Sequence, residues 1–189
     1  MKMAMDLAAE TGADMVFGSD PDADRIGLAV RDEKGGLKLL TGNQIVAILT
    51  KYLLERWKSL GKLTGKEYMV TTIVTTELIT EICKDYGVEL YRVLTGFKNI
   101  AEIVRNNEGR RTFIGGGEES NGYNAGEFVR DKDSAVSIGL VCECAAWLAD
   151  RGQTLYGFLQ EIYAQYGLYT DKLVSVVRKG IEGLGQIKQ

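Results

Sequence analysis

The sequence of 189 residues contains no histidine, a single proline and only three cysteines. Because it offers no imidazole, this chain cannot form a Ser-His-Asp triad or a histidine-based zinc site by itself. General acid–base chemistry must therefore come from carboxylates, lysine, tyrosine, water or a missing part of the protein. The odd set of Cys83, Cys142 and Cys144 favours buried free thiols in a reducing compartment over a disulfide or a metal site.

Long apolar runs, dense basic clusters and a signal-peptide pattern are also missing. No stretch approaches the roughly 20 apolar residues of a membrane span, so we expect no membrane partner. The net charge is -3, and no Lys/Arg run could neutralise a row of phosphates, which argues against nucleic-acid binding. The cytoplasm is the default location. The length and the 45% hydrophobic content suit a soluble protein of one domain or parts of two.

The periodicity of the apolar residues predicts an α/β fold. We expect a helix at 3–11, then strands at 13–18, 26–30 and 37–40. From residue 41 onward, helices at 43–60, 77–86 and 99–106 alternate with strands at 68–74, 89–93 and 111–114. This alternation predicts a three-layer α/β/α sandwich with a parallel or mixed sheet. Residues 134–149 are apolar almost all round and predict a fully buried helix, 155–163 predict an amphipathic helix, and 173–178 predict a last strand.

The stretch GSDPDADR at 18–25 carries Asp20, Asp22 and Asp24 at alternate positions. Two unit charges about 6 Å apart repel by roughly 3 kcal/mol at an effective dielectric of 20, so three carboxylates need a counter-charge. A divalent cation supplies it, and oxygen-only ligands favour Mg²⁺, Ca²⁺ or Mn²⁺. Pro21 limits the freedom of the loop, and Arg25 offers a planar donor for phosphate.

Other interpretations compete with a phosphate-linked metal site. An EF-hand loop would need Gly at Arg25 and Glu at Arg31, so it is excluded. A solvated turn with a capping aspartate stays open. A haloacid-dehalogenase-like phosphatase also stays open: it would use Asp20 as nucleophile and Asp22 as acid/base, although Asp24 replaces its usual Thr or Val.

Three further polar loops could carry chemistry. TGFKN at 95–99 follows a strand and opens a helix, so Lys98 could face an anion or be an ordinary surface lysine. GGGEESNGY at 115–123 combines glycines that allow close backbone approach with Glu118 and Ser120, which suit vicinal hydroxyls. RDKDS at 130–134 could cap the next helix with Asp131 or Asp133.

Taken in order, DPDADR, TGFKN, GEESNGY and RDKD resemble motifs of the α-D-phosphohexomutase family, the phosphoglucomutases and phosphomannomutases. The similarity runs over nearly the whole chain. In that family a phosphoserine exchanges phosphoryl groups with a hexose 1- or 6-phosphate through a bisphosphorylated sugar such as glucose 1,6-bisphosphate. The resemblance implies Mg²⁺ bound by Asp20, Asp22 and Asp24, with Arg25 as a catalytic residue beside it. It also implies that sugar phosphate is bound by Thr95, Lys98, Glu118, Ser120 and Lys132.

The departures from the family pattern imply a central piece of a longer polypeptide. Many relatives have glycines at Pro21 and Ala23. Some relatives end the sugar-binding loop in histidine. The corresponding stretch here, GEESNGY at 117–123 (the sugar loop), ends in Tyr123, which is the candidate acid/base. There is no His-Asn-Pro serine loop and no Arg-x-Ser-x-Thr phosphate loop.

We therefore expect 1–40 to end domain 2, 41–167 to form domain 3 and 168–189 to begin domain 4. The missing amino- and carboxyl-terminal domains would be partners, glucose or both glucose and mannose the substrates, and the isolated chain inactive. A non-catalytic metal or sugar-phosphate binding module is the other class left open.

Overall fold

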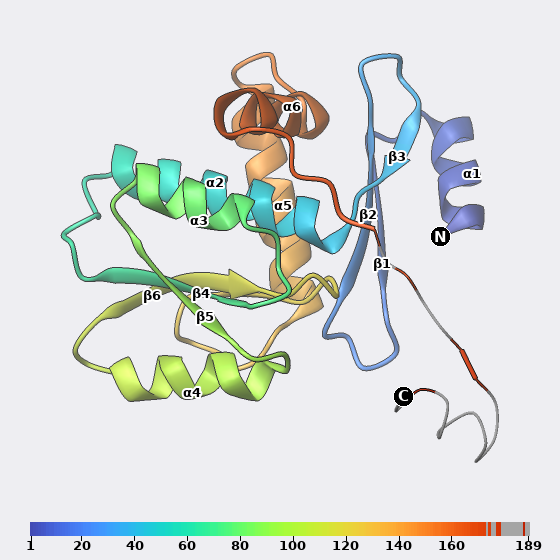
Figure 1. Ribbon diagram of the computed structural model, residues 1–189. Helices are drawn as coiled ribbons and strands as arrows, with labels where there is room; N and C mark the ends of the chain where they lie inside the picture. Colours follow the sequence, from blue (N-terminus) through green and yellow to red (C-terminus); the bar gives the residue numbers. More distant parts are fainter. Residues whose placement is uncertain (173, 175–176, 179–186, 188–189) are drawn as a thin grey trace.

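Two β-sheets of different kinds organise the residues that the computed structural model describes, namely 1–172, 174, 177–178 and 187 (Figure 1). The three-stranded sheet is antiparallel and contains β1 (Met15–Ser19), β2 (Ile26–Arg31) and β3 (Leu37–Leu39) in that order. Helix α1 (Lys2–Thr11) packs on β1. The first strands were thus predicted to within two residues.

The four-stranded sheet has the order β5-β4-β6-β7. Its central strand β4 (Glu67–Thr72) pairs in parallel with β5 (Glu89–Val93) and β6 (Thr112–Gly117), whereas β7 (Tyr123–Ala125) is antiparallel to β6. Helices α2 (Gly42–Ser59) and α3 (Leu78–Asp85) cover one face, and α4 (Phe97–Asn107) covers the other (Figure 1). This arrangement confirms the predicted three-layer α/β sandwich with a mixed sheet. The short strand β7 was not predicted.

Helix α2 begins with a capping box and provides much of the core. The Thr41 hydroxyl accepts a hydrogen bond from the Gln44 amide at 3.3 Å, while the Gln44 side chain accepts one from the Thr41 amide at 2.9 Å. Both bonds satisfy amides that have no partner within the helix. The apolar face then buries Ile45, Ile48 and Leu49, each at most 2% exposed.

Helix α5 (Ser134–Ala149) is buried on only one face, so the prediction of a fully buried helix was wrong. Its buried positions are Ser134, Ser137, Val141, Cys144 and Leu148, whereas Ala135, Gly139, Cys142 and Ala146 are exposed. Hydropathy could not distinguish the two faces because small apolar residues occupy both of them. The predicted burial of the cysteines is confirmed for Cys83 and Cys144 and wrong for Cys142.

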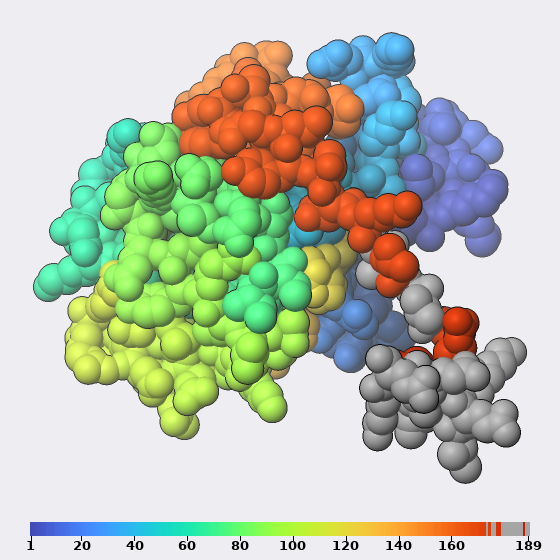
Figure 2. Space-filling view, in the orientation of Figure 1, coloured from blue at the N-terminus to red at the C-terminus, as the bar shows by residue number. Residues whose placement is uncertain are grey.

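Helix α6 (Leu155–Tyr166) confirms the predicted amphipathic stripe, with Leu155, Phe158, Leu159 and Ile162 buried. It contacts α2, α3 and β2, and it forms much of the surface between α3 and the three-stranded sheet (Figure 2). The strand predicted for 173–178 lies partly outside the described residues. No helix in the described ranges is long and apolar enough to cross a membrane. The division of the chain at 40/41 and 167/168 stays a prediction.

The glycines at 115–117 belong to strand β6, which corrects the prediction that they form part of a ligand-binding loop. A Cβ atom on Gly116 would lie 2.1 Å from the Val70 carbonyl oxygen, and one on Gly117 would lie 2.7 Å from Val46 and from Tyr123. These glycines therefore allow close packing within the sheet. Tyr123 is only 1% exposed, and burial raises the pKa of its hydroxyl. A group so enclosed cannot exchange protons with a bound substrate, so the acid/base candidate was wrong.

Candidate metal centre and surrounding loops

The three aspartates lie in the hairpin that joins the antiparallel strands β1 and β2. One carboxylate oxygen from each of Asp20, Asp22 and Asp24 lies within 4.8 Å of the others. Oxygen donors at this spacing match the ligands that Mg²⁺, Ca²⁺ and Mn²⁺ prefer. The alternating acids predicted from the sequence therefore converge on one point.

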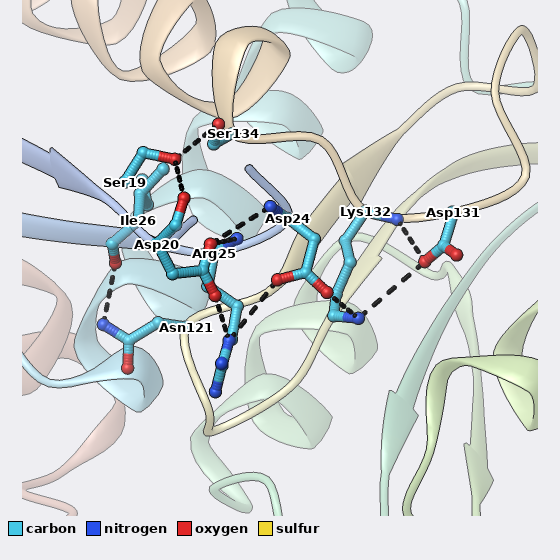
Figure 3. Close-up of polar contacts among 9 residues, drawn as sticks. All are labelled: Ser19, Asp20, Asp24, Arg25, Ile26, Asn121, Asp131, Lys132 and Ser134. Atoms are coloured by element: carbon cyan, nitrogen blue, oxygen red, sulfur yellow. Dashed lines mark hydrogen bonds and ion pairs between the residues drawn. The ribbon is translucent and has the colours of Figure 1, made fainter. Parts of the chain in front are cut away.

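Asp20 holds the loop in shape through three hydrogen bonds (Figure 3). Its Oδ1 accepts from the amides of Asp24 and Arg25 at 3.2 and 3.1 Å, and its Oδ2 accepts from Arg25 Nε at 2.6 Å. Desolvation acts to raise the pKa of Asp20, but the bonds from Arg25 and Asp24 outweigh it and lower the pKa to about 2. Asp20 is consequently ionised at neutral pH, and its charge raises the pKa of Arg25.

The tip of the loop is attached to the start of α5. Ala23 has a φ of 56°, a left-handed conformation that costs a residue with a Cβ atom about 1–2 kcal/mol. Its carbonyl accepts a hydrogen bond from the Ser134 amide at 3.0 Å, and the hydroxyls of Ser19 and Ser134 are 3.0 Å apart. Glycine would adopt this conformation without that cost.

Asp24 provides the test of whether a cation fits. Its Oδ2 lies 2.6 Å from Lys132 Nζ. Its Oδ1 is buried and has no hydrogen-bond partner among the described residues, although Arg25 Nε lies 3.4 Å away. A buried carboxylate oxygen without a hydrogen bond is costly, and coordination of a cation would satisfy it. The donor set and this oxygen both fit a hard divalent cation.

Glu118 connects the sugar loop to the TGFKN loop. It is 6% exposed, and its Oε1 accepts a hydrogen bond from the Gly96 amide at 3.2 Å. Burial raises the pKa of Glu118, even though the Gly96 amide and the nearby charge of Lys132 act to lower it. The carboxylate is thus held near Lys132 with its charge only partly compensated.

The predicted site residues do not all meet. Asp20, Asp22, Asp24, Arg25 and Lys132 form one charged cluster, and Glu118 lies close to it. Ser120 is exposed and lines a hollow of about 340 Å³ together with Asp20 and Arg25. Thr95 is exposed in the neighbouring loop and Lys98 in the first turn of α4, and Glu118 contacts this loop through Gly96. Asp133, one of the two residues predicted to cap α5, does so by accepting a hydrogen bond from the Val136 amide at 3.0 Å.

Sequence reasoning missed Asn121, which joins the sugar loop to the metal hairpin. Its backbone oxygen accepts from the Ile26 amide at 3.2 Å, and its side-chain Nδ2 donates to the Ile26 carbonyl at 2.8 Å. Its φ of 73° lies in the left-handed region. The Asn-Gly pair at 121–122 is typical of such turns and could have marked it.

Comparisons with known proteins agree with this fold. The model of the phosphoglucomutase/phosphomannomutase alpha/beta/alpha domain III matches residues 41–166. A phosphoglucomutase of Staphylococcus aureus MRSA252 is 37% identical over 185 residues, which cover 98% of this chain and 33% of that protein.

Two solved structures share the fold. A phosphoglucomutase/phosphomannomutase family protein of Burkholderia thailandensis has a TM-score of 0.63 at 17% identity, covering 85% of this chain and 32% of that one. An Aspergillus fumigatus N-acetylphosphoglucosamine mutase, solved with GlcNAc-6P and magnesium, has a TM-score of 0.57 at 21% identity, covering 81% and 35%.

The fold and these similarities together define the chain as an α/β domain of the phosphohexomutase type. Since the family model covers well over half of the sequence, the chain belongs to the phosphoglucomutase/phosphomannomutase family. It spans 33% of the length of the curated Staphylococcus relative.

Proposed function

We propose that this chain is the central part of a cytoplasmic phosphohexomutase that interconverts hexose 1-phosphate and hexose 6-phosphate. Glucose is the favoured sugar, with mannose as a second, and glucose 1,6-bisphosphate is the intermediate. One observation carries the proposal: three carboxylates and an arginine of one loop form a cluster with a lysine of a second loop, and a buried glutamate of a third loop lies close to that lysine. Other domains of the same polypeptide would supply the phosphoserine and the remaining phosphate contacts.

Asp20, Asp22 and Asp24 would hold Mg²⁺, which when bound neutralises charge on a transferring phosphoryl group. Arg25 supports a phosphate role because its Nε is held by Asp20 while its side chain stays half exposed. The remaining guanidinium N–H groups can therefore donate to phosphate oxygens.

The sugar would be held by the loops opposite the metal. Glu118 accepts hydrogen bonds from sugar hydroxyls, and Ser120 can donate or accept beside the hollow at Asp20. Lys98 and Thr95, exposed at the start of α4, would contact phosphate together with Lys132. Such contacts position the sugar phosphate for transfer.

The phosphatase alternative receives no support from the comparisons. The matching family model and the Staphylococcus relative are both described as mutases. The mutase proposal alone uses all four loops.

Calorimetric titration of Mg²⁺ into the 189-residue chain tests the proposal. We expect binding that weakens at least about tenfold in Asp22→Asn, because one charged ligand is lost. Asp6→Asn, in an exposed pair with Lys2 on α1, removes the same charge elsewhere and should bind like wild type. Glucose 1,6-bisphosphate should bind with Mg²⁺ present. Equal metal binding in Asp22→Asn, or no metal binding at all, would contradict the metal assignment.

A further inference from the structure

Lys132 lies where the metal, TGFKN, sugar and RDKD loops meet. Its Nζ lies 2.6 Å from Asp24 Oδ2 and 3.9 Å from Asp131 Oδ1, and it lies 5.5 Å from the centre of the Phe97 ring. Only 16% of its side chain is exposed. The ammonium group is therefore held against a carboxylate that the metal would also need.

The sugar loop leaves room for this lysine. A Cβ atom on the buried Gly122 would lie 2.4 Å from Lys132 Cδ and 3.1 Å from its Cε. A side chain at position 122 would thus displace the stem of Lys132 from its path toward Asp24. The contact between Lys132 and Asp24 consequently depends on the shape of the sugar loop as well as on charge.

Two protein cations balance two of the three aspartates. Arg25 contacts Asp20, and Lys132 contacts Asp24, whereas no ion pair involves Asp22 among the described residues. Together they supply two positive charges, the same as one divalent ion. A cation on Asp24 Oδ1 would repel the Lys132 ammonium on Oδ2, because both are positive and the two oxygens share a single negative charge.

We propose that Lys132 is a displaceable counter-ion: it neutralises Asp24 in the metal-free protein and leaves that carboxylate when a divalent cation binds. The released ammonium, with Asp131 as an alternative partner, then becomes available to a phosphate group. Metal binding would in this way prepare the site for sugar phosphate. The identity of that second ligand rests on the proposed function, whereas the competition with metal does not.

The test measures Mn²⁺ affinity of the 189-residue chain by calorimetry, without any sugar phosphate. Lys132→Met keeps a stem of similar shape and removes the charge, so we expect about fivefold tighter Mn²⁺ binding. Lys38→Met is the matched control, since Lys38 pairs with Asp32 outside the cluster and should change the affinity by less than about twofold. Unchanged or weaker Mn²⁺ binding in Lys132→Met would overturn the inference.

A crystal structure of the wild-type chain with Mn²⁺ provides a measurement that needs no variant. We expect the ion on Asp24 and Lys132 Nζ more than about 4 Å from Oδ2, beyond ion-pair distance. An ion on Asp24 with the 2.6 Å contact intact would overturn the counter-ion role.

The two proposals can fail separately. If Asp22→Asn loses Mn²⁺ while Lys132→Met binds it like wild type, the counter-ion role is wrong and the metal site stands. If the wild-type chain binds no Mn²⁺, both are wrong.

Discussion

At the scale of single residues, glycines set how closely the loops of the site approach each other, because they have no side chain. A Cβ atom on Gly42, at the start of α2, would lie 2.0 Å from the Glu119 carbonyl oxygen and 2.7 Å from the Asn121 amide. The sugar loop can lie against the start of α2 only because this position is glycine. Gly139, exposed in α5, has no atom within 4 Å of the same position.

These two helical glycines should respond in opposite ways to substitution by alanine. Gly42→Ala should lower the free energy of unfolding by about 1–3 kcal/mol, because backbone must move to admit the methyl group. Gly139→Ala should raise it by up to about 1 kcal/mol through helix propensity alone. Urea denaturation of both variants measures the difference. Equal effects of the two substitutions would show that Gly42 is not sterically required.

The buried carboxylate of Glu118 gives the stability of the protein a pH dependence. Its folded-state pKa is raised, so its contribution to stability is full below the unfolded pKa of about 4.3 and is lost as pH rises through the folded pKa. Glu118→Gln keeps an acceptor for the Gly96 amide and removes the charge. We therefore expect this substitution to increase stability more at pH 7 than at pH 4.

Thermal unfolding across this pH range measures the effect of Glu118→Gln. Glu33→Gln, at the exposed turn between β2 and β3, is the control. Its difference in stability from wild type should stay the same across this pH range. A difference for Glu118→Gln that does not change with pH would mean that the Glu118 charge is fully compensated in the folded protein.

At the scale of elements, the site forms where two hairpins and two helix starts converge. The β1–β2 hairpin carries the aspartates, and the β6–β7 hairpin carries Glu118 and Asn121. Helix α4 contributes its N-cap residue, Gly96, and α5 contributes Ser134 in its first turn. The paired bonds between Asn121 and Ile26 join the two hairpins directly.

Asn121 should therefore stabilise the contact between the hairpins. Asn121→Ala loses the side-chain bond to Ile26 and puts alanine at a φ of 73°, which asparagine tolerates better, so we expect the free energy of unfolding to fall by about 1–3 kcal/mol. Asn121→Gly loses the bond but adopts this φ freely, so it should cost less. Urea denaturation ranks the two variants. If alanine is tolerated better than glycine, the left-handed backbone is not what selects Asn121.

At the scale of the whole molecule, the described residues complete a metal-type loop and a sugar-type loop but contain no candidate for the phosphoryl carrier of the family. We therefore predict that the 189-residue chain alone does not convert glucose 1-phosphate to glucose 6-phosphate, even with Mg²⁺ and glucose 1,6-bisphosphate. A coupled assay for glucose 6-phosphate measures this, with a full-length family member as the positive control. Turnover by the purified chain would contradict the prediction.

Much of the fold was accessible from the sequence because it depends on local spacing. The stripe of Ile45, Ile48 and Leu49 is visible at helical spacing whatever α2 packs against. The strands were placed to within a few residues because short apolar runs alternate with helices. The aspartate cluster was equally local, since its members lie in one loop.

Sequence by itself thus determined the order of the elements apart from β7, the α/β class and the clustering of the three aspartates, all of which follow from residues near each other in the chain. Only the tertiary structure decided which face of α5 is buried, that Gly115–Gly117 form a strand against β4, and that Lys132 pairs with Asp24. The physical reason is that each of these depends on contacts between distant segments. Steric fit and charge balance at such contacts exist only once the chain has folded.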